Sequence, residues 1–387
     1  MTPPRARHPA PEQPAARAAY YTSTFANKPT VADMTALGAQ IFRDPSLSAS
    51  GHLACATCHD PANAFAPSTG LAVQRGGATG DALGVRAAPS LRYLAAIPRF
   101  TEHFHDGDDD GIDQGPAGGL TWDGRADSTH DQAKSPLFSP LEMANRSADE
   151  LAGKLRRTSY AAAFVTTFGT GALDTTESAI KAATLALEVY QQDPATFYPY
   201  SSKFDAVLRG TAKLSPTEAR GKQIFDDPKR GNCATCHPDT IKAGFPAFTD
   251  FGFIALGVPR NRALPSTRDP AYFDLGLCGP YRTDLSARTD YCGMFRTPSL
   301  RNVTSRKRFM HNGELATLHD VLEFYATRDV TPARWYRGGE LFDDLPTEYH
   351  RNVNRDAPFG PTRMLSEADI ADVLAFLATL TDADVGR

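Results

Sequence analysis

The 387-residue sequence lacks several features, and each absence excludes a class of function. It has no basic excess, because 41 Lys and Arg stand against 45 Asp and Glu, so no nucleic acid or anionic membrane surface is indicated as a partner. It has no run of about 18 apolar residues, the length that crosses a bilayer, so no membrane span is expected. It has only six Cys and two Trp, which makes the position of each one informative.

The N-terminus lacks the apolar stretch of a secretory signal. Residues 1–30 carry charge and proline instead, and we expect a disordered leader there. Gly and Pro are plentiful, at 30 and 29 residues, which favours helices joined by long irregular segments over a compact sheet. The length suggests two domains, or one domain with long insertions. We therefore expect an all-α chain with long irregular loops.

Four of the six cysteines lie in two identical Cys-Ala-Thr-Cys-His pentapeptides, at residues 55–59 and 233–237. This is the attachment pattern of c-type haem, in which two thiols bond the haem vinyl groups and the adjoining imidazole binds the iron. A zinc site or a redox dithiol is the alternative, but neither needs a His fixed after the second Cys. The pattern predicts two covalent haem c groups held by Cys55, Cys58, Cys233 and Cys236, with His59 and His237 as the proximal iron ligands. Covalent haem attachment needs an exporting compartment, which predicts a periplasmic protein.

The remaining cysteines, Cys278 and Cys292, are separated by thirteen residues that include Gly279 and Pro280. In an oxidising compartment they could form a disulfide, and closing such a loop contributes about 3 kcal/mol in the chain-entropy model. Two free thiols are the alternative, because sequence gives no distance between them.

Each haem peptide follows a similar segment, Gly-Ala-Gln-Ile-Phe at residues 38–42 and Gly-Lys-Gln-Ile-Phe at residues 221–225. This internal duplication predicts two cytochrome c-like helical haem domains, an N-terminal peroxidatic one over 31–205 and a C-terminal electron-transfer one over 206–387. Ser215 with Glu218, and Ser366 with Asp369, are capping-box pairs that predict helix starts. Residues 176–191 carry an apolar stripe and predict another helix.

Beyond the haem peptides, two longer motifs occur: Trp-Asp-Gly-Arg at residues 122–125, and Arg-Thr-Pro-Ser-Leu-Arg-Asn-Val at 296–303, followed by His-Asn-Gly at 311–313. Through these motifs the sequence resembles the diheme cytochrome c peroxidase and MauG superfamily over about residues 35 to 385. The resemblance implies a peroxide-reactive N-terminal haem, an electron-transferring C-terminal haem and a tryptophan, Trp122, between them. An indole packed in the core is the alternative reading of Trp122.

The sixth ligand of the C-terminal haem separates the branches of this superfamily. Its peroxidases use Met, but the corresponding position, fourteen residues after His311, is Tyr325. The resemblance therefore implies a MauG-like branch in which Tyr325 binds the iron, and an anionic phenolate favours ferric and higher states. Alternatively, Tyr325 belongs to the core and Met294 or Met310 is the ligand.

The N-terminal haem needs an open iron position if peroxide is to bind. Family members that require prior reduction block it with a His some sixteen residues past the haem peptide, where this sequence has Arg75, and no His occurs between His59 and His103. The resting site is therefore expected to be open, unless His103 or His105 folds back as a ligand.

Counted from Trp122, the family's distal-pocket residues correspond to Gln132, Pro136 and Glu142. Glu142 would carry a proton between the two peroxide oxygens, Gln132 would orient the bound oxygen, and Pro136 would shape the pocket. A surface acid is the alternative reading of Glu142.

At two positions the sequence differs from the family pattern, and the differences bear on the partner protein and on calcium binding. Gly231 replaces the Trp that passes oxidising equivalents to methylamine dehydrogenase in some MauG-type enzymes, so another substrate is expected. Trp335 is a candidate for the residue through which oxidising equivalents leave the protein. The alternative is that Trp335 is an exposed or half-packed indole without this role. The family's calcium-binding Asn is Ala87 here, whereas the acidic segment 106–111 resembles half of a calcium loop, so Ca2+ is considered there against a solvated turn.

These features together predict a MauG-like diheme enzyme. It would react with hydrogen peroxide to form a bis-Fe(IV) state and oxidise a partner, a Trp or Tyr of another protein, by long-range electron transfer. The first alternative is a cytochrome c peroxidase that reduces hydrogen peroxide with electrons from a small cytochrome or cupredoxin. A diheme electron carrier without catalysis is a third class.

Overall fold

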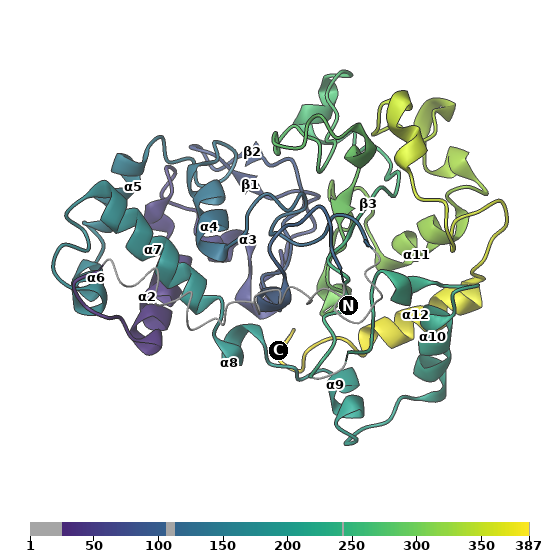
Figure 1. Ribbon diagram of the computed structural model, residues 1–387, viewed down its shortest axis with the longest axis horizontal. Coiled ribbons are helices and arrows are strands. Elements are labelled where there is room, and N and C mark those ends of the chain that lie inside the picture. Colours follow the sequence, from purple (N-terminus) through teal and green to yellow (C-terminus); the bar gives the residue numbers. More distant parts are fainter. Residues whose placement is uncertain (1–24, 106–112, 242–243, 387) are drawn as a thin grey trace, which may run out of the picture.

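The computed structural model describes residues 25–105, 113–241 and 244–386. In Figure 1 two helical lobes lie side by side, the N-terminal half in purple to teal and the C-terminal half in green to yellow. Each lobe has its own hydrophobic core, one built from side chains between Met34 and Phe197 and the other from side chains between Phe204 and Leu380. The two haem peptides therefore belong to separate cores. No helix among the described residues is long and apolar enough to cross a membrane.

The N-terminal lobe is built around a crossing of two helices. Its helices are α2 (Val31–Arg43), α3 (Cys55–Cys58), α4 (Thr129–Phe138), α5 (Ala148–Leu155), α6 (Ala161–Phe168), α7 (Thr176–Tyr190) and α8 (Pro194–Phe197). Helix α2 packs on α7 at Gly38, where an added Cβ would collide with the Ala186 carbonyl oxygen. The absence of a side chain lets the two helix backbones touch.

The C-terminal lobe repeats this crossing with the equivalent glycine. Its helices are α9 (Lys203–Leu208), α10 (Pro216–Asp226), α11 (Leu318–Thr327) and α12 (Glu367–Ala378). Helix α10 packs on α12 at Gly221, where a Cβ would collide with the Asp372 carbonyl oxygen. Gly38 and Gly221 are the first residues of the duplicated sequence segments, so the duplication preserves a backbone contact. The predicted capping boxes at Ser215 and Ser366 are confirmed.

Two short antiparallel sheets interrupt the loops. Strand β1 (Arg75–Gly76) pairs with β2 (Ala82–Leu83), and β3 (Phe253–Ile254) pairs with β4 (Phe295–Arg296). The chain is thus mainly helical, and the predicted all-α class is too strict. Strands of two residues carry no alternating pattern, which is why the sequence did not indicate them.

Buried ion pairs join the lobes. The Arg86 guanidinium bonds the carboxylates of Asp123 and Asp274, each at 2.7 Å. The chain end returns to the N-terminal lobe, where Asp382 accepts hydrogen bonds from Arg92 and Tyr93. These contacts fix the position of one haem peptide relative to the other.

Three further predictions can be placed. Cys278 and Cys292 form a disulfide, with Cα atoms 5.0 Å apart. Within the predicted leader, Phe25 packs on Phe168 with ring centroids 4.5 Å apart, so its end is packed, while residues 1–24 lie outside the described residues. The acidic segment 106–111 also lies outside them.

Candidate haem and catalytic sites

The C-terminal haem peptide opens into a cavity of about 240 Å³. Cys233, Cys236 and His237 line it. They lie just after α10, where the chain forms a short 3₁₀ turn at Cys233–Thr235. The Nδ1 atom of His237 lies 2.9 Å from the Phe248 carbonyl oxygen, which leaves Nε2 for a ligand. Burial lowers the pKa of His237 to about 4, so the imidazole is neutral, the form that binds metals.

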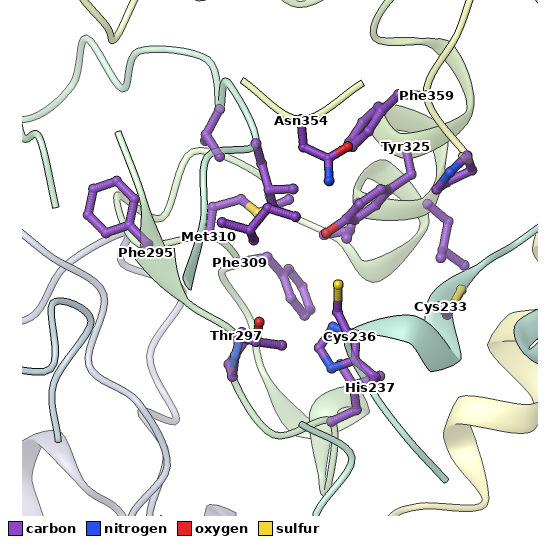
Figure 2. Close-up of a pocket in the computed structure, with 18 of the residues that line it drawn as sticks. Cys233, Cys236, His237, Phe295, Thr297, Phe309, Met310, Tyr325, Asn354 and Phe359 are labelled. Atoms are coloured by element: carbon purple, nitrogen blue, oxygen red, sulfur yellow. The ribbon is translucent and has the colours of Figure 1, made fainter. Parts of the chain in front are cut away.

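Tyr325 lies in the same cavity, on α11. Figure 2 shows its phenol oxygen directed toward Cys236 and His237, with the Phe359 ring beside it. Burial raises the pKa of Tyr325 and the two nearby thiols raise it further, whereas the positive charge of Arg328 lowers it. Met310 also lines the cavity, but Met294 is not among the lining residues. The structure therefore brings Tyr325 and Met310 to the site as candidate ligands.

The N-terminal peptide has the same local construction. Cys55–Cys58 forms α3, and Nδ1 of His59 lies 3.2 Å from the Phe65 carbonyl oxygen. Burial lowers the pKa of His59 to about 4. Phe65 and Phe248 both have left-handed backbones, with φ of 56° and 54°. Each lobe thus uses a strained Phe to hold its histidine, an arrangement that the sequence analysis missed.

Gln132 and Pro136 are four residues apart on α4, so they share one helix face. Pro136 has no N–H, and the carbonyl of Gln132 therefore lacks its usual helical partner. Glu142 follows this helix, and its carbonyl oxygen accepts a 2.7 Å hydrogen bond from the Gly77 N–H. Gly76 packs so closely on Leu141 and Glu142 that no Cβ fits there.

The Glu142 carboxylate lies beside the N-terminal haem peptide. Burial raises the pKa of Cys58 to about 11, and the negative charge of Glu142 contributes to that rise. The Glu142 side chain reaches solvent, but the surrounding chain displaces much of the water near its carboxyl, and this desolvation raises the pKa of Glu142. A hydrogen bond with Ser139 and the positive charge of Arg125 lower it by less. A carboxyl with a raised pKa, open to a small molecule, is suited to carry a proton.

The two histidines considered as alternative ligands, His103 and His105, both have exposed side chains. The Nδ1 atom of His103 lies 2.5 Å from an Asp113 oxygen. Arg75 lies on β1 with its guanidinium bonded to the Asp81 carbonyl. The open position at the N-terminal haem stays a prediction.

Trp122, from the N-terminal half of the chain, reaches the C-terminal site. It lines the C-terminal cavity, and its indole N–H donates a 2.8 Å hydrogen bond to the Ala87 carbonyl. The next carbonyl, that of Ala88, accepts from Arg306, and the backbone of Pro89 lies close enough to the His59 imidazole to raise its pKa against the larger effect of burial. Three consecutive residues thus connect the indole to the N-terminal ligand.

Two arginines of the C-terminal cavity bear on whether a haem fits there. Arg296 and Arg306 both line it, burial lowers the pKa of each to about 10, and neither forms an ion pair with a described residue. The Nε2 atom of His311 is buried without a hydrogen-bond partner in the described chain. Isolated buried charges are costly, and the carboxylates of the haem propionates would neutralise them. Together with the free thiols at both peptides, these residues fit the haem.

No group of three or more His, Cys, Asp or Glu that could hold a metal ion is found within the described ranges. At Ala87, which replaces the family's calcium-binding Asn, the carbonyl accepts the hydrogen bond of the Trp122 indole and the N–H donates to the His311 carbonyl. Trp335, the candidate exit, lies half-buried against Phe324.

The chain is similar to several known proteins. The sequence model of the family described as di-haem cytochrome c peroxidase matches residues 32–213. The methylamine utilization protein MauG of Paracoccus denitrificans is 35% identical over 365 residues, covering 90% of this chain and 88% of that protein.

Two solved structures are also similar. The diheme peroxidase BthA of Burkholderia thailandensis is 42% identical, with a TM-score of 0.81, covering 91% of this chain and 86% of that one. A MauG-like protein associated with microbial copper homeostasis is 25% identical, with a TM-score of 0.64, covering 91% and 90%. The chain therefore belongs to the di-haem cytochrome c peroxidase and MauG family, as a haem-dependent oxidoreductase of the MauG-like branch.

Proposed function

We propose that this MauG-like diheme enzyme reacts with hydrogen peroxide in the N-terminal lobe and oxidises a Trp or Tyr of a partner protein through the C-terminal lobe. The observation that carries the proposal is the position of Tyr325 in the C-terminal cavity, with its oxygen directed toward His237. A phenolate ligand favours oxidised iron, whereas a peroxidase that accepts electrons from a small cytochrome or cupredoxin works with a thioether. The alternative of a cytochrome c peroxidase fits this ligand less well.

The cofactors would be two haem c groups, held by Cys55 and Cys58 with His59, and by Cys233 and Cys236 with His237. When bound, they supply the peroxide chemistry and store oxidising equivalents. The compartment we propose is the periplasm, because covalent attachment and the Cys278–Cys292 disulfide both require export. The functional units are the lobes over 31–205 and 206–387. Calcium binding by the segment 106–111 stays a prediction.

The protein residues have separate roles in this proposal. Glu142 accepts a proton from one peroxide oxygen and delivers it to the other, so that the leaving group is water. Gln132 orients the bound oxygen with its amide, and Pro136 shapes the pocket wall. Trp122, bonded to the Ala87 carbonyl, provides an oxidisable indole between the lobes. Tyr325 supplies an anionic ligand on the C-terminal side.

Mixing the haem-loaded diferric protein with one equivalent of hydrogen peroxide, without reductant, tests this function. We expect visible, near-infrared and Mössbauer spectra to show both irons oxidised above the ferric state. If no change occurs until one haem is reduced, the protein is a reductively activated cytochrome c peroxidase. If both irons are already six-coordinate and never react, it is an electron carrier.

A further inference from the structure

The second tryptophan, Trp335, contacts a residue adjacent to Tyr325. Its ring meets Phe324 edge to face, with centroids 5.4 Å apart and an interplanar angle of 89°. Phe324 is fully buried, and its ring centroid is 6.1 Å from that of Tyr325. Phe359 closes a second side of this cluster, 5.1 Å from Tyr325 and 6.1 Å from Phe324. Aromatic contacts therefore run without a gap from the C-terminal cavity to Trp335.

This arrangement suits electron transfer. Tunnelling weakens steeply with distance and with gaps in packing, so two ring contacts keep Trp335 coupled to the cavity. Phenylalanine is hard to oxidise, and Phe324 would serve only as the intervening medium. Trp335 is thus an oxidisable ring in continuous contact with Tyr325, and it is only partly buried.

The hydrogen bond of the Trp335 indole favours reversible oxidation of the ring. Its N–H donates to the Thr327 hydroxyl at 3.1 Å, and that hydroxyl donates in turn to the Glu323 carbonyl at 2.7 Å. A hydroxyl is a poor base, so an oxidised indole would keep its proton and could be reduced again. The Arg334 guanidinium lies 4.9 Å from the indole centroid, but the Glu323 carboxylate, 2.6 Å from Arg334, offsets its charge.

The surface around Trp335 is accessible to another protein. The segment from Thr331 to Leu341 is mostly exposed, and Val330 and Leu341 are 36% and 42% exposed. Exposed arginines, Arg334 and Arg337, belong to the same segment. Apolar and arginine side chains beside an indole are typical of a protein interface.

We propose that Trp335 is the relay residue through which electrons from a partner protein enter the C-terminal lobe, an inference that rests on the proposed function. In each cycle the indole gives one electron toward Tyr325 and regains one from the partner. Two cycles supply the two electrons that, with two protons, reduce one hydrogen peroxide to two waters. Without a partner, the indole loses a second electron to the peroxide-oxidised site, adds the oxygen of a water molecule and releases two protons, so that the neutral ring has lost two electrons in all and becomes hydroxytryptophan.

Tyr281 offers the rival route. It is 37% exposed, and its hydroxyl lies 3.0 Å from that of Tyr272. Its link to the cavity runs through the Arg86 guanidinium, which lies over both Tyr281 and Phe295, and not through adjoining rings. Tyr281→Phe is therefore the matched control for Trp335→Phe.

The experiment treats the haem-loaded protein with peroxide alone and reads peptide masses, the radical signal in electron paramagnetic resonance, and the lifetime of the oxidised spectrum. We expect one added oxygen on the Trp335 peptide, loss of the radical in Trp335→Phe, and an oxidised state that lasts about tenfold longer in that variant. Trp335→Tyr, which keeps an oxidisable ring, should restore a short lifetime, and Tyr281→Phe should match the wild type.

The outcomes separate the two proposals. If the wild type forms the oxidised state but Trp335→Phe decays at the wild-type rate, or if Tyr281 is the oxidised residue, the relay is wrong and the proposed function stands. If the wild type never forms that state, both proposals fail. Haem content and the far-ultraviolet spectrum of each variant show whether it has folded.

Discussion

The ring of Tyr325 stacks on that of Phe359, with centroids 5.1 Å apart and planes inclined by 26°. The Arg328 guanidinium lies 3.5 Å from the Phe359 centroid and lowers the pKa of Tyr325 against the larger effect of burial. Phe359 therefore limits how the phenol can turn, and Arg328 favours its anionic form. The ring contact orients Tyr325, and the charge of Arg328 offsets part of the rise in pKa that burial causes.

Replacement of this phenol tests the ligand assignment. Tyr325→Phe removes an oxygen that makes no hydrogen bond within the described part of the chain, so we expect the fold to persist. The C-terminal haem should lose its sixth ligand and become high-spin, which resting electron paramagnetic resonance spectra detect. Tyr349→Phe, in the same core, is the control. An unchanged spectrum for Tyr325→Phe, with a changed one for Met310→Leu, would identify Met310 as the ligand.

Glu142→Gln tests proton transfer in the N-terminal lobe. A glutamine cannot accept the peroxide proton, so we expect the reaction of the diferric protein with peroxide to slow by about 100-fold or more. Stopped-flow spectroscopy measures this rate. Glu150→Gln, which alters a partly buried acid on α5 that pairs with Arg146 and Lys154, should leave the rate unchanged.

The pH profile gives a second measure of Glu142. Desolvation raises its pKa above the ordinary 4.5. Because the carboxylate must be deprotonated to accept a proton, the wild-type rate should fall as the pH drops through this raised pKa, at a higher pH than an ordinary Glu would show. Glu142→Gln should lack this decline. A decline of the same shape in the variant would assign the titration to another group.

Gly76→Ala tests whether the β1 backbone positions Glu142. The new Cβ would collide with the backbone of Leu141 and Glu142, and such overpacking costs about 1–3 kcal/mol. We expect lower thermal stability together with a slower reaction with peroxide. Gly70→Ala is the matched control, because it has open space around it. Equal behaviour of the two variants would show that the close approach at Gly76 does not position the acid.

Local signals explain what the sequence predicted well. The capping boxes at Ser215 and Ser366 involve residues three positions apart, so they can be recognised without knowledge of the fold. The haem peptides are likewise contiguous. The duplicated segments indicated a repeat, but the reason for Gly38 and Gly221, close contact with a distant helix, required the structure.

Features that depend on tertiary structure were missed. The carbonyls that hold His59 and His237 come from Phe65 and Phe248, six and eleven residues downstream, and any residue type can supply a carbonyl. The short sheets have no sequence pattern. The sequence also does not show whether Arg296 has a carboxylate partner, because the neighbours of a buried side chain come from distant segments. In the described part of the chain it has none.

Arg296→Met tests the assignment of the unpaired cations to haem propionates. A buried positive charge beside a haem favours the ferrous state, so its removal should lower the midpoint potential of the C-terminal haem. We expect a fall of about 60 mV, which corresponds to a tenfold change in a one-electron equilibrium. Spectroelectrochemical titration measures it, and Lys307→Met, which removes an exposed charge next to Arg306 in the sequence, is the control. The removal of an unpaired charge should also stabilise the haem-free chain, since burial lowers the pKa of Arg296 to about 10. A haem-free variant less stable than the wild type, with an unchanged potential, would show that Arg296 acts through its hydrogen bond to the Thr121 carbonyl and not through its charge.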